Sequence, residues 1–328
     1  MKKILYLNNG RSAIDIGIKL LAIKKGSQVL VPEIICDVAV EVILRNNLDV
    51  IYYKLDNKFQ PIWNDIYKKS FNKVSSIIMV HFFGYPQDIS KFKKFAKKKK
   101  ILLIEDNCHS LNINYKGRIL GLNGDIGIDS PRKILSGIYS GGRLFINKKN
   151  NFNSKFIKKY RPNFFEITKK NIKDKFPILI KIFKILKNRP SYESPYVFSG
   201  KDKNYSLKLM DEFSKNKLIK FDLKKESLRR VKIFNNINDF AKKNKIKPVF
   251  KISKNLIPLY FVGITKDHEH SKKIYDWGWK NNIEIVSWPS FYRNKKLNKT
   301  LLNKWSKYIC ISLSQNFNKN LNLIKINF

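Results

Sequence analysis

The chain has 328 residues, 43% of them hydrophobic, which is enough for two domains or for one large α/β domain with a smaller appendage. It contains no uncharged apolar run of membrane-spanning length, and its basic start breaks off at Asn8-Asn9-Gly10. We therefore expect no membrane span and no secretory leader, and assign the chain to the cytoplasm. Its scattered cysteines, Cys36, Cys108 and Cys310, include no Cys-x-x-Cys pair and indicate reduced thiols without a metal site.

The net charge of +42 raises the alternative of a nucleic-acid-binding protein. The basic residues are, however, spread over nearly the whole chain, and only ten of the 67 are arginine, the residue favoured for bidentate phosphate contacts. Lysine, asparagine, isoleucine and phenylalanine are all abundant, as an AT-rich genome would cause. We attribute the charge mainly to composition and expect no specific nucleic-acid site, although a general attraction for anions, including nucleotide-linked substrates, follows from it.

In the first half of the chain, short apolar runs alternate with amphipathic segments. Apolar residues at helical spacing predict a helix over 12–24. Strands are predicted at 29–32, 49–53, 75–81, 101–105 and 143–147. This alternation predicts a mainly parallel sheet whose ligands bind at the carboxyl ends of the strands, and Asp106 lies at one such end.

The second half is organised differently. Residues 150–203 form a lysine-rich, mostly helical insertion, in which 176–186 predict either a helix packed on its own domain or a basic face for a membrane or partner. Residues 206–243 predict one long helix. Strands at 257–262, 283–286 and 308–313 with a helix at 271–281 predict a small α+β domain. We divide the chain into a large domain, 1–235, and a small C-terminal domain, 236–328.

Two residues suggest the chemistry. Asp106 ends an apolar run in Ile104-Glu105-Asp106-Asn107-Cys108-His109, and Lys133 follows 27 positions later in Ser130-Pro131-Arg132-Lys133, shortly before Gly141-Gly142. A pyridoxal phosphate (PLP) enzyme needs such a pair, because the acid keeps the pyridine nitrogen protonated and the lysine carries the aldehyde as a Schiff base. Neither residue is specific alone: Asp106 by itself is an ordinary acid after a strand, and Lys133 is one of 57 lysines.

An ordered set of motifs over residues 8–147 resembles the DegT/DnrJ/StrS family of nucleotide-sugar aminotransferases. These motifs are Asn9-Gly10-Arg11-Ser12-Ala13, Val29-Leu30-Val31-Pro32, His81-Phe82-Phe83-Gly84-Tyr85-Pro86, Glu105-Asp106-Asn107-Cys108-His109, Tyr115-Lys116-Gly117-Arg118 and Gly124-Asp125, followed by Ser130, Lys133 and Gly141-Gly142. The resemblance implies the α/β fold of the PLP-dependent transferases of fold type I, with a mainly parallel large domain and a smaller α+β domain.

The resemblance also implies a phosphate site. Gly10, Arg11 and Ser12 would offer backbone N–H groups, and Ser12 its hydroxyl, at a helix N-terminus whose dipole favours the cofactor phosphate. Read alone, this turn is an ordinary helix cap. Ser130 would donate to the same phosphate.

Three further roles concern the cofactor ring. Asp106 would pair with the pyridinium nitrogen, and His109 would reach the phenolic oxygen or stack near the ring. Lys133 would hold PLP and then move a proton as a general base. Some relatives that dehydrate deoxysugars carry histidine in place of this lysine, so Lys133 favours amino transfer.

The chain departs from the family pattern at two places. The interval from Asp125 to Lys133 is two residues shorter than usual, so the alignment of Ser130 assumes a local deletion. Cys36 aligns with the aromatic residue that stacks on the ring. Loss of an aromatic stack costs roughly 0.5–1.5 kcal/mol beyond burial, which does not exclude PLP.

The sequence thus predicts a PLP-dependent aminotransferase that moves an amino group, from glutamate, onto a nucleotide-linked keto sugar in the synthesis of surface polysaccharide or another glycoconjugate. By family analogy it is a homodimer. Two alternatives stay open: a catalytically degenerate regulatory or nucleic-acid-binding protein on the same fold, and an aminotransferase that acts on a non-sugar substrate. His268 and His270 flank Glu269 with no further ligand in view, so no metal site is predicted.

Overall fold

The computed structural model describes residues 3–111, 113–147, 157–168, 192, 196–197, 207–286, 290–291, 299–314 and 326. Most of the lysine-rich interval 150–203, with its apolar segment 176–186, lies outside the described residues, so the helices predicted there stay predictions. No helix within these ranges is both long and apolar enough to cross a bilayer.

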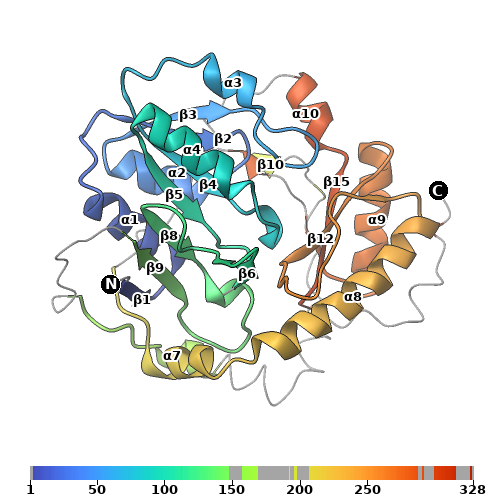
Figure 1. The fold of residues 1–328 in the computed structure, drawn as a ribbon. Helices are drawn as coiled ribbons and strands as arrows, with labels where there is room; N and C mark the ends of the chain where they lie inside the picture. The colour runs from blue at the N-terminus through green and yellow to red at the C-terminus, as the bar shows by residue number, and fades with distance from the viewer. Residues whose placement is uncertain are drawn as a thin grey trace.

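A seven-stranded sheet with the order β1-β9-β8-β5-β4-β2-β3 forms the centre of the large domain (Figure 1). Its strands are β1 (Lys3–Leu7), β2 (Gln28–Pro32), β3 (Asp49–Tyr53), β4 (Val74–Val80), β5 (Leu102–Asp106), β8 (Ile126–Asp129) and β9 (Gly142–Ile146). Neighbours from β8 to β3 run parallel, whereas β9 pairs antiparallel with both β8 and β1. The predicted mainly parallel sheet is confirmed. The sequence patterns did not predict β1 and β8.

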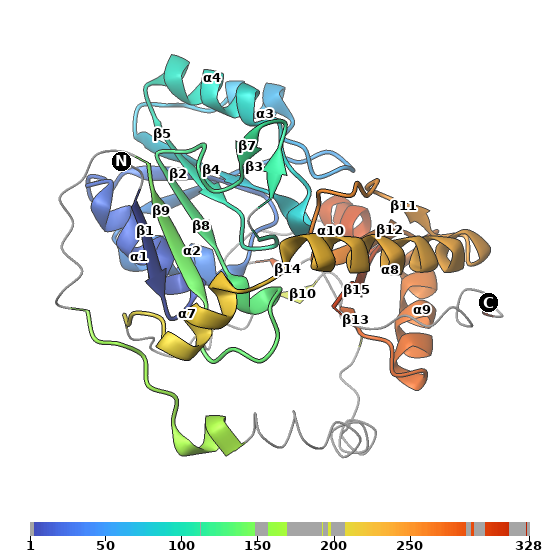
Figure 2. The same cartoon turned by 60° about the horizontal axis from the view of Figure 1, so that its bottom comes forward.

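Helices cover both faces of this sheet, as expected for a strand–helix alternation. They are α1 (Gly10–Leu20), α2 (Asp37–Arg45), α3 (Trp63–Tyr67) and α4 (Ile89–Lys99). Figure 2 shows α3 and α4 above the sheet and α1 and α2 below it. The helix α1 packs on β8 and β9, so its N-terminus is brought close to the ends of these strands.

The C-terminal part builds a second, smaller sheet with the order β11-β12-β15-β13. It is antiparallel at each pairing and is flanked by helices. Its elements are β11 (Lys247–Pro248), β12 (Tyr260–Ile264), α9 (His268–Lys280), β13 (Ile285–Val286), α10 (Lys299–Trp305) and β15 (Tyr308–Ser312). Two short pairs complete the strands of the described residues: β6 (Asn114–Tyr115) with β7 (Arg118–Ile119), and β10 (Tyr196–Val197) with β14 (Ser290–Phe291). The predicted strands and helix of this part are confirmed.

The long helix predicted over 206–243 is two helices, α7 (Glu212–Ile219) and α8 (Leu223–Lys243). The break occurs because Asp222 caps α8: its side chain accepts the Lys225 backbone N–H at 2.9 Å. The helix α8 spans the predicted boundary at 235/236 and runs from the large domain along the small one (Figures 1 and 2).

An aromatic cluster joins the two domains. The fully buried ring of Phe59 lies 5.3 Å from those of Phe82 and Phe83 in the large domain. It also lies 5.8 Å from the ring of Phe250 and 5.1 Å from that of Trp305, both in the C-terminal part. The domains therefore share one continuous hydrophobic core.

Candidate active site

Two turns meet at the carboxyl ends of β5 and β8. One opens α1 at Gly10 and the other, which follows β8, carries Ser130. A Cβ added to Gly10 would lie 3.7 Å from the Ser130 Cβ and 3.6 Å from the Cys108 Sγ. The two turns and the loop after β5 therefore form the walls of one cradle.

The Gly141-Gly142 pair allows this approach. A Cβ on Gly142 would lie 2.2 Å from the backbone of Asn9, and one on Gly141 would lie 2.9 Å from the backbone nitrogen of Arg132. The Gly141 N–H also donates to the Asn8 carbonyl at 2.8 Å. Only glycine permits β9 to pass this close to both turns, which explains the motif physically.

The predicted phosphate role of Ser12 stays a prediction, and the structure shows the present partners of this residue. Ser12 is fully buried, and its backbone N–H donates to the Asn9 side chain at 2.9 Å as part of the cap of α1. Its hydroxyl donates to the Asn8 side chain at 2.7 Å. Ser12 therefore helps to hold this turn, and Gly10 and Arg11 lie beside it in the first turn of α1, where a phosphate is predicted to bind.

Lys133 ends the short 3₁₀ turn η2 (Pro131–Lys133) directly after Ser130. The turn is closed by the Lys133 N–H, which donates to the Ser130 carbonyl at 2.9 Å, and the Ser130 hydroxyl donates to the Gly141 carbonyl at 3.3 Å. The Lys133 side chain is exposed. Its charge acts to lower the pKa of Cys36, Cys108 and His109, so it lies within electrostatic range of these three residues.

Asp106 stands at the end of β5, where it was predicted, and its side chain is half-buried. One carboxylate oxygen accepts the Cys108 backbone N–H at 2.9 Å, which orients the acid toward the loop that carries His109. Burial raises the pKa of the Cys108 thiol well above its usual value, and the negative charge of Asp106 adds to this effect while Lys133 opposes it. Asp106, Cys108 and Lys133 thus share one electrostatic environment.

His109 is held as a neutral imidazole. Its Nδ1 accepts the Phe83 backbone N–H at 3.1 Å, and its ring stacks on that of Phe83 with centroids 5.7 Å apart. Burial, with a smaller effect from the Lys133 charge, lowers the pKa of His109 well below its usual value. Because Nδ1 is the acceptor, the remaining proton is on Nε2, which makes His109 a hydrogen-bond donor.

Cys36 directly precedes α2. Its thiol lies 3.4 Å from the Asp37 carboxylate. Although part of the side chain reaches the surface, crowding around the sulfur raises the pKa of the thiol, and Lys133 acts in the opposite direction. Cys36 is therefore within electrostatic range of Lys133, and it carries a thiol where the resemblance places an aromatic ring.

Sequence patterns missed a buried ion pair beneath Ser130. The Arg143 Nε donates to the Asp129 carboxylate at 3.0 Å, and both side chains are buried. Burial raises the pKa of Asp129, and Arg143 opposes this shift. Asp129 and Arg143 are direct partners in the antiparallel register of β8 and β9. A prediction of the ion pair would therefore have required the pairing of these two strands.

A second buried pair, His81 with Glu105, explains why two of the sequence motifs begin with these residues. The His81 ring lies 2.9 Å from the Glu105 carboxylate, and both side chains are fully buried. Burial alone would raise the pKa of Glu105, but hydrogen bonds from His81 and from the backbone outweigh it and lower that pKa. His81 and Glu105 thus fasten β4 to β5 and fix the strand end that carries Asp106.

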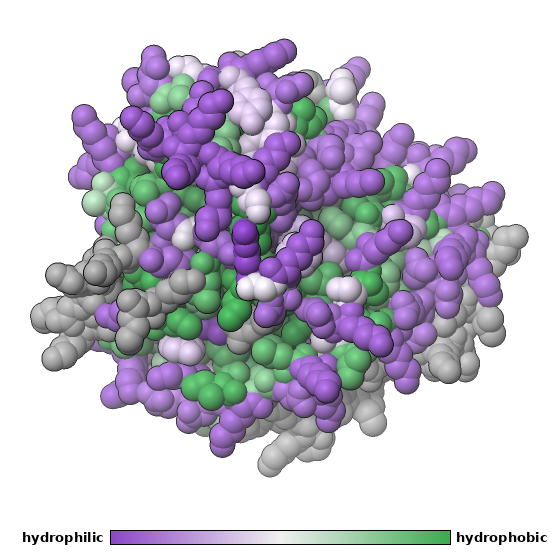
Figure 3. Space-filling view, in the orientation of Figure 1, coloured by the Kyte–Doolittle hydropathy of each residue, from purple (hydrophilic) through white to green (hydrophobic). Residues whose placement is uncertain are grey.

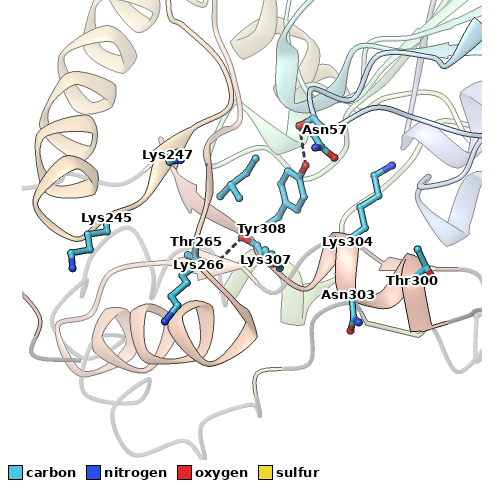
Figure 4. A pocket seen from close by; sticks show the side chains of 11 residues that line it. Asn57, Lys245, Lys247, Thr265, Lys266, Thr300, Asn303, Lys304, Lys307 and Tyr308 are labelled. Atoms are coloured by element: carbon cyan, nitrogen blue, oxygen red, sulfur yellow. Dashed lines mark hydrogen bonds between the residues drawn. The ribbon is translucent and has the colours of Figure 1, made fainter.

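A cavity of about 700 Å³ lies elsewhere, between the loop after β3 and the C-terminal part (Figure 4). Lysines and small polar residues line it, and Tyr308 in its wall donates to the Asn57 carbonyl at 2.9 Å. None of the predicted site residues contributes to it. In the part of the chain that the structure describes, no three His, Cys, Asp or Glu side chains gather as a metal site would require. The residues around Lys133 are therefore the candidate active site.

Comparison with solved structures identifies the fold as that of the PLP-dependent transferases of fold type I. A lysine in a turn beside β8, an acid at the end of β5 and a helix N-terminus between them are typical of the PLP-dependent transferases of fold type I. Solved structures agree on the fold. The putative sugar aminotransferase Spr1654 from Streptococcus pneumoniae, in its PLP form, gives a TM-score of 0.64 at 15% identity, with 98% of this chain and 84% of that chain covered. NtdA from Bacillus subtilis with bound cofactor PMP gives a TM-score of 0.64 at 16% identity, with 98% and 71% covered.

Within this class, residues 1–155 match the model of the DegT/DnrJ/EryC1/StrS aminotransferase family, which confirms the resemblance for this part of the chain. GDP-perosamine synthase of Escherichia coli O157:H7 is 31% identical over 147 residues, which are 44% of this chain and 40% of that protein. The dTDP-4-dehydro-2,3,6-trideoxy-D-glucose 4-aminotransferase of Saccharopolyspora spinosa is 21% identical over 148 residues, 44% of this chain and 38% of that protein. The match spans about two fifths of the length of these curated relatives.

Proposed function

We propose that the chain is a PLP-dependent aminotransferase. The single observation that carries the proposal is that three separate turns share one electrostatic environment: the Lys133 charge acts on the ionisation of Cys108 and His109, and Asp106 accepts the Cys108 backbone N–H. Gly10 supports a phosphate in the cradle because it brings the N-terminus of α1 beside Ser130: the Ser130 hydroxyl oxygen would lie 3.9 Å from a Cβ added at Gly10. When bound, PLP supplies a ring that accepts electrons from a substrate carbon.

Each residue of the site would have a separate role in binding the cofactor or in moving a proton. Asp106 would hold the proton on the ring nitrogen, and the first turn of α1 at Gly10 and Arg11 would bind the phosphate through its dipole. The Nε2–H of His109 would donate to the phenolic oxygen. Lys133 would carry the cofactor and, once released from it, move the proton at the substrate carbon as a general base.

For the substrate, we propose a keto sugar linked to a nucleotide, with glutamate as the amino donor and a glycoconjugate pathway as the destination. The names of three relatives specify GDP-, dTDP- and UDP-linked sugars, so they support the substrate class and not one nucleotide. Another relative is the GDP-4-keto-6-deoxy-D-mannose 3-dehydratase of Yersinia pseudotuberculosis; the lysine at position 133 favours amino transfer over such dehydration. The expected homodimer and the expected cytoplasmic location stay predictions.

The test is an absorption spectrum of the protein purified with PLP, before and after borohydride, for wild type, Lys133→Ala and Lys94→Ala. Lys94 is an exposed lysine of α4 and serves as the matched control. We expect a visible cofactor band in wild type and Lys94→Ala that borohydride fixes to the peptide containing Lys133. Lys133→Ala should lose the fixed band and at least about 10³-fold in transamination rate.

The contrary outcomes are distinct. A folded wild-type protein without the band would favour the catalytically degenerate alternative, and transamination by Lys133→Ala at the wild-type rate would refute the assigned mechanism. If the band is present, glutamate with GDP-, dTDP- and UDP-linked keto sugars, compared with simple keto acids, separates the sugar substrate from the non-sugar alternative.

A further inference from the structure

Arg230 is a fully buried arginine of α8 that no sequence motif singled out for the site. A buried guanidinium is stable only when its donors find partners. Its Nε donates to the Glu226 carboxylate at 2.6 Å, one turn earlier in the same helix. Its two terminal nitrogens donate to backbone carbonyls, to Pro258 at 2.5 Å and to Ile134 at the long distance of 3.5 Å.

The Ile134 carbonyl belongs to the turn that carries the catalytic lysine. Ile134 directly follows Lys133, and the turn is closed by the Leu135 N–H, which donates to the Pro131 carbonyl at 2.7 Å. Ile134 and Leu135 are both buried. Arg230 thus reaches the far end of this shortened turn with a donor at the outer limit of hydrogen-bond distance.

The Pro258 carbonyl belongs to a segment packed against the other half of the site. A Cβ on Gly84 would lie 2.9 Å from the Pro258 Cα and 2.7 Å from the His109 carbonyl oxygen. The next residue, Leu259, donates its N–H to the Phe83 carbonyl at 2.7 Å, and Phe83 in turn donates to His109. One planar guanidinium thus contacts both the lysine turn and the segment that supports His109.

We propose that Arg230 is a positioning residue that sets the placement of Lys133 relative to His109. Because the fork of Arg230 is planar, its donors fix two carbonyls in one geometry, and Glu226 fixes the fork. A lysine at this position would keep the charge but would not hold both carbonyls. This inference rests on the proposed function, since the two positioned residues are those assigned to the cofactor.

The helix offers a matched control in Arg229. Its Nε and one terminal nitrogen donate to the same Glu226 carboxylate at 2.8 and 2.7 Å. Its carbonyl partners, Leu313 at 3.2 Å and Ser314 at 3.5 Å, directly follow β15 and do not belong to the lysine turn. Arg229→Lys therefore repeats the chemical change and the shared partner without touching the lysine turn.

The experiment compares wild type, Arg230→Lys and Arg229→Lys, all loaded with PLP. The readouts are the pH at which the visible band of the lysine-bound cofactor changes, the melting temperature, and kcat and KM for the sugar substrate. For Arg230→Lys we expect a displaced pH midpoint and a kcat reduced by at least about tenfold, with KM nearly unchanged. Arg229→Lys should keep the wild-type midpoint and kcat.

The inference is overturned if Arg230→Lys keeps the wild-type midpoint and kcat, or if Arg229→Lys changes both equally, which would indicate general loosening of α8. If Arg230→Lys does not fold, Glu226→Gln replaces it: this change keeps Arg230 but removes its charged partner, so an unchanged midpoint there overturns the inference too. Absence of the band in wild type is a different result, because it refutes the proposed function and with it the basis for this inference.

Discussion

His109 illustrates how a single side chain acquires its chemical state from its neighbours. A free histidine changes its charge near pH 6.5, but burial and the Lys133 charge keep this imidazole neutral well below that pH. The Phe83 N–H occupies Nδ1 and leaves the proton on Nε2. Phe83 itself has a positive φ of 56°, an uncommon conformation for a bulky residue, which its own contacts with His109 and Leu259 stabilise.

This state predicts a pH dependence of stability. Because the folded-state pKa of His109 is lowered, the unfolded chain binds the extra proton more readily, so stability is present above the unfolded pKa of about 6.5 and declines as the pH falls below it. His109→Gln, which retains an acceptor for Phe83, should lower this slope by at most about 1.4 kcal/mol per pH unit. Urea unfolding at several pH values between 5 and 8 measures it. An identical slope in the variant would contradict the lowered pKa assigned to His109. The pKa of His270 is also lowered, but His270 is present in both proteins, so its contribution cancels in the comparison.

At the scale of elements, the strand β9 and the turn before α1 form one unit. The strand passes so close to the turn that Gly142 has no room for a side chain, and the Gly141 N–H fastens the contact. The cradle is therefore shaped by a strand and a turn that are more than a hundred residues apart in the sequence.

Two glycine substitutions distinguish the contribution of this unit to stability from its contribution to PLP binding. Gly142→Ala should destabilise the protein by about 1–3 kcal/mol, since a backbone contact must open to admit the methyl group. Gly10→Ala meets only ordinary contacts, so it should keep the stability but weaken PLP binding, because the methyl group projects toward Ser130 and Cys108. Melting curves and PLP titrations measure both effects. Equal stability of the two variants would show that β9 does not constrain the turn.

At the scale of the whole molecule, charge and core act in opposite directions. The charge of +42 makes the molecule repel itself, and hydrophilic side chains are spread over the face in Figure 3 with hydrophobic ones between them. Against this repulsion, the aromatic cluster around Phe59 connects the large domain with the C-terminal part. We infer that the two domains unfold as one cooperative unit.

Phe59→Ala tests that inference. Removing the fully buried ring should lower the free energy of unfolding by about 3–5 kcal/mol and expose a separate transition for the C-terminal part. Phe213→Ala, at a phenylalanine that is 48% exposed, is the control and should leave a single transition near the wild-type temperature. Calorimetry distinguishes the outcomes. A single transition in Phe59→Ala would mean that other contacts are sufficient to couple the domains.

Local patterns in the sequence determined the order of most strands and helices, the sheet class and the location of Asp106 at a strand end. Alternation, caps and turn residues act over a few positions, so they can be read without the fold. The same holds for Lys133, whose surrounding motif marks a turn. The break at Asp222 was missed because it depends on a single cap in an otherwise continuous helical pattern.

Only the tertiary structure decided which side chains meet. It directed Ser12 into its own turn, paired Asp129 with Arg143 and placed Arg230 between the lysine turn and the segment beside His109. Each of these contacts joins separate elements or depends on how a helix end is packed, so no local pattern contains it. The sequence by itself determined the residue types available for the chemistry, whereas long-range packing determined their orientation, charge state and partners.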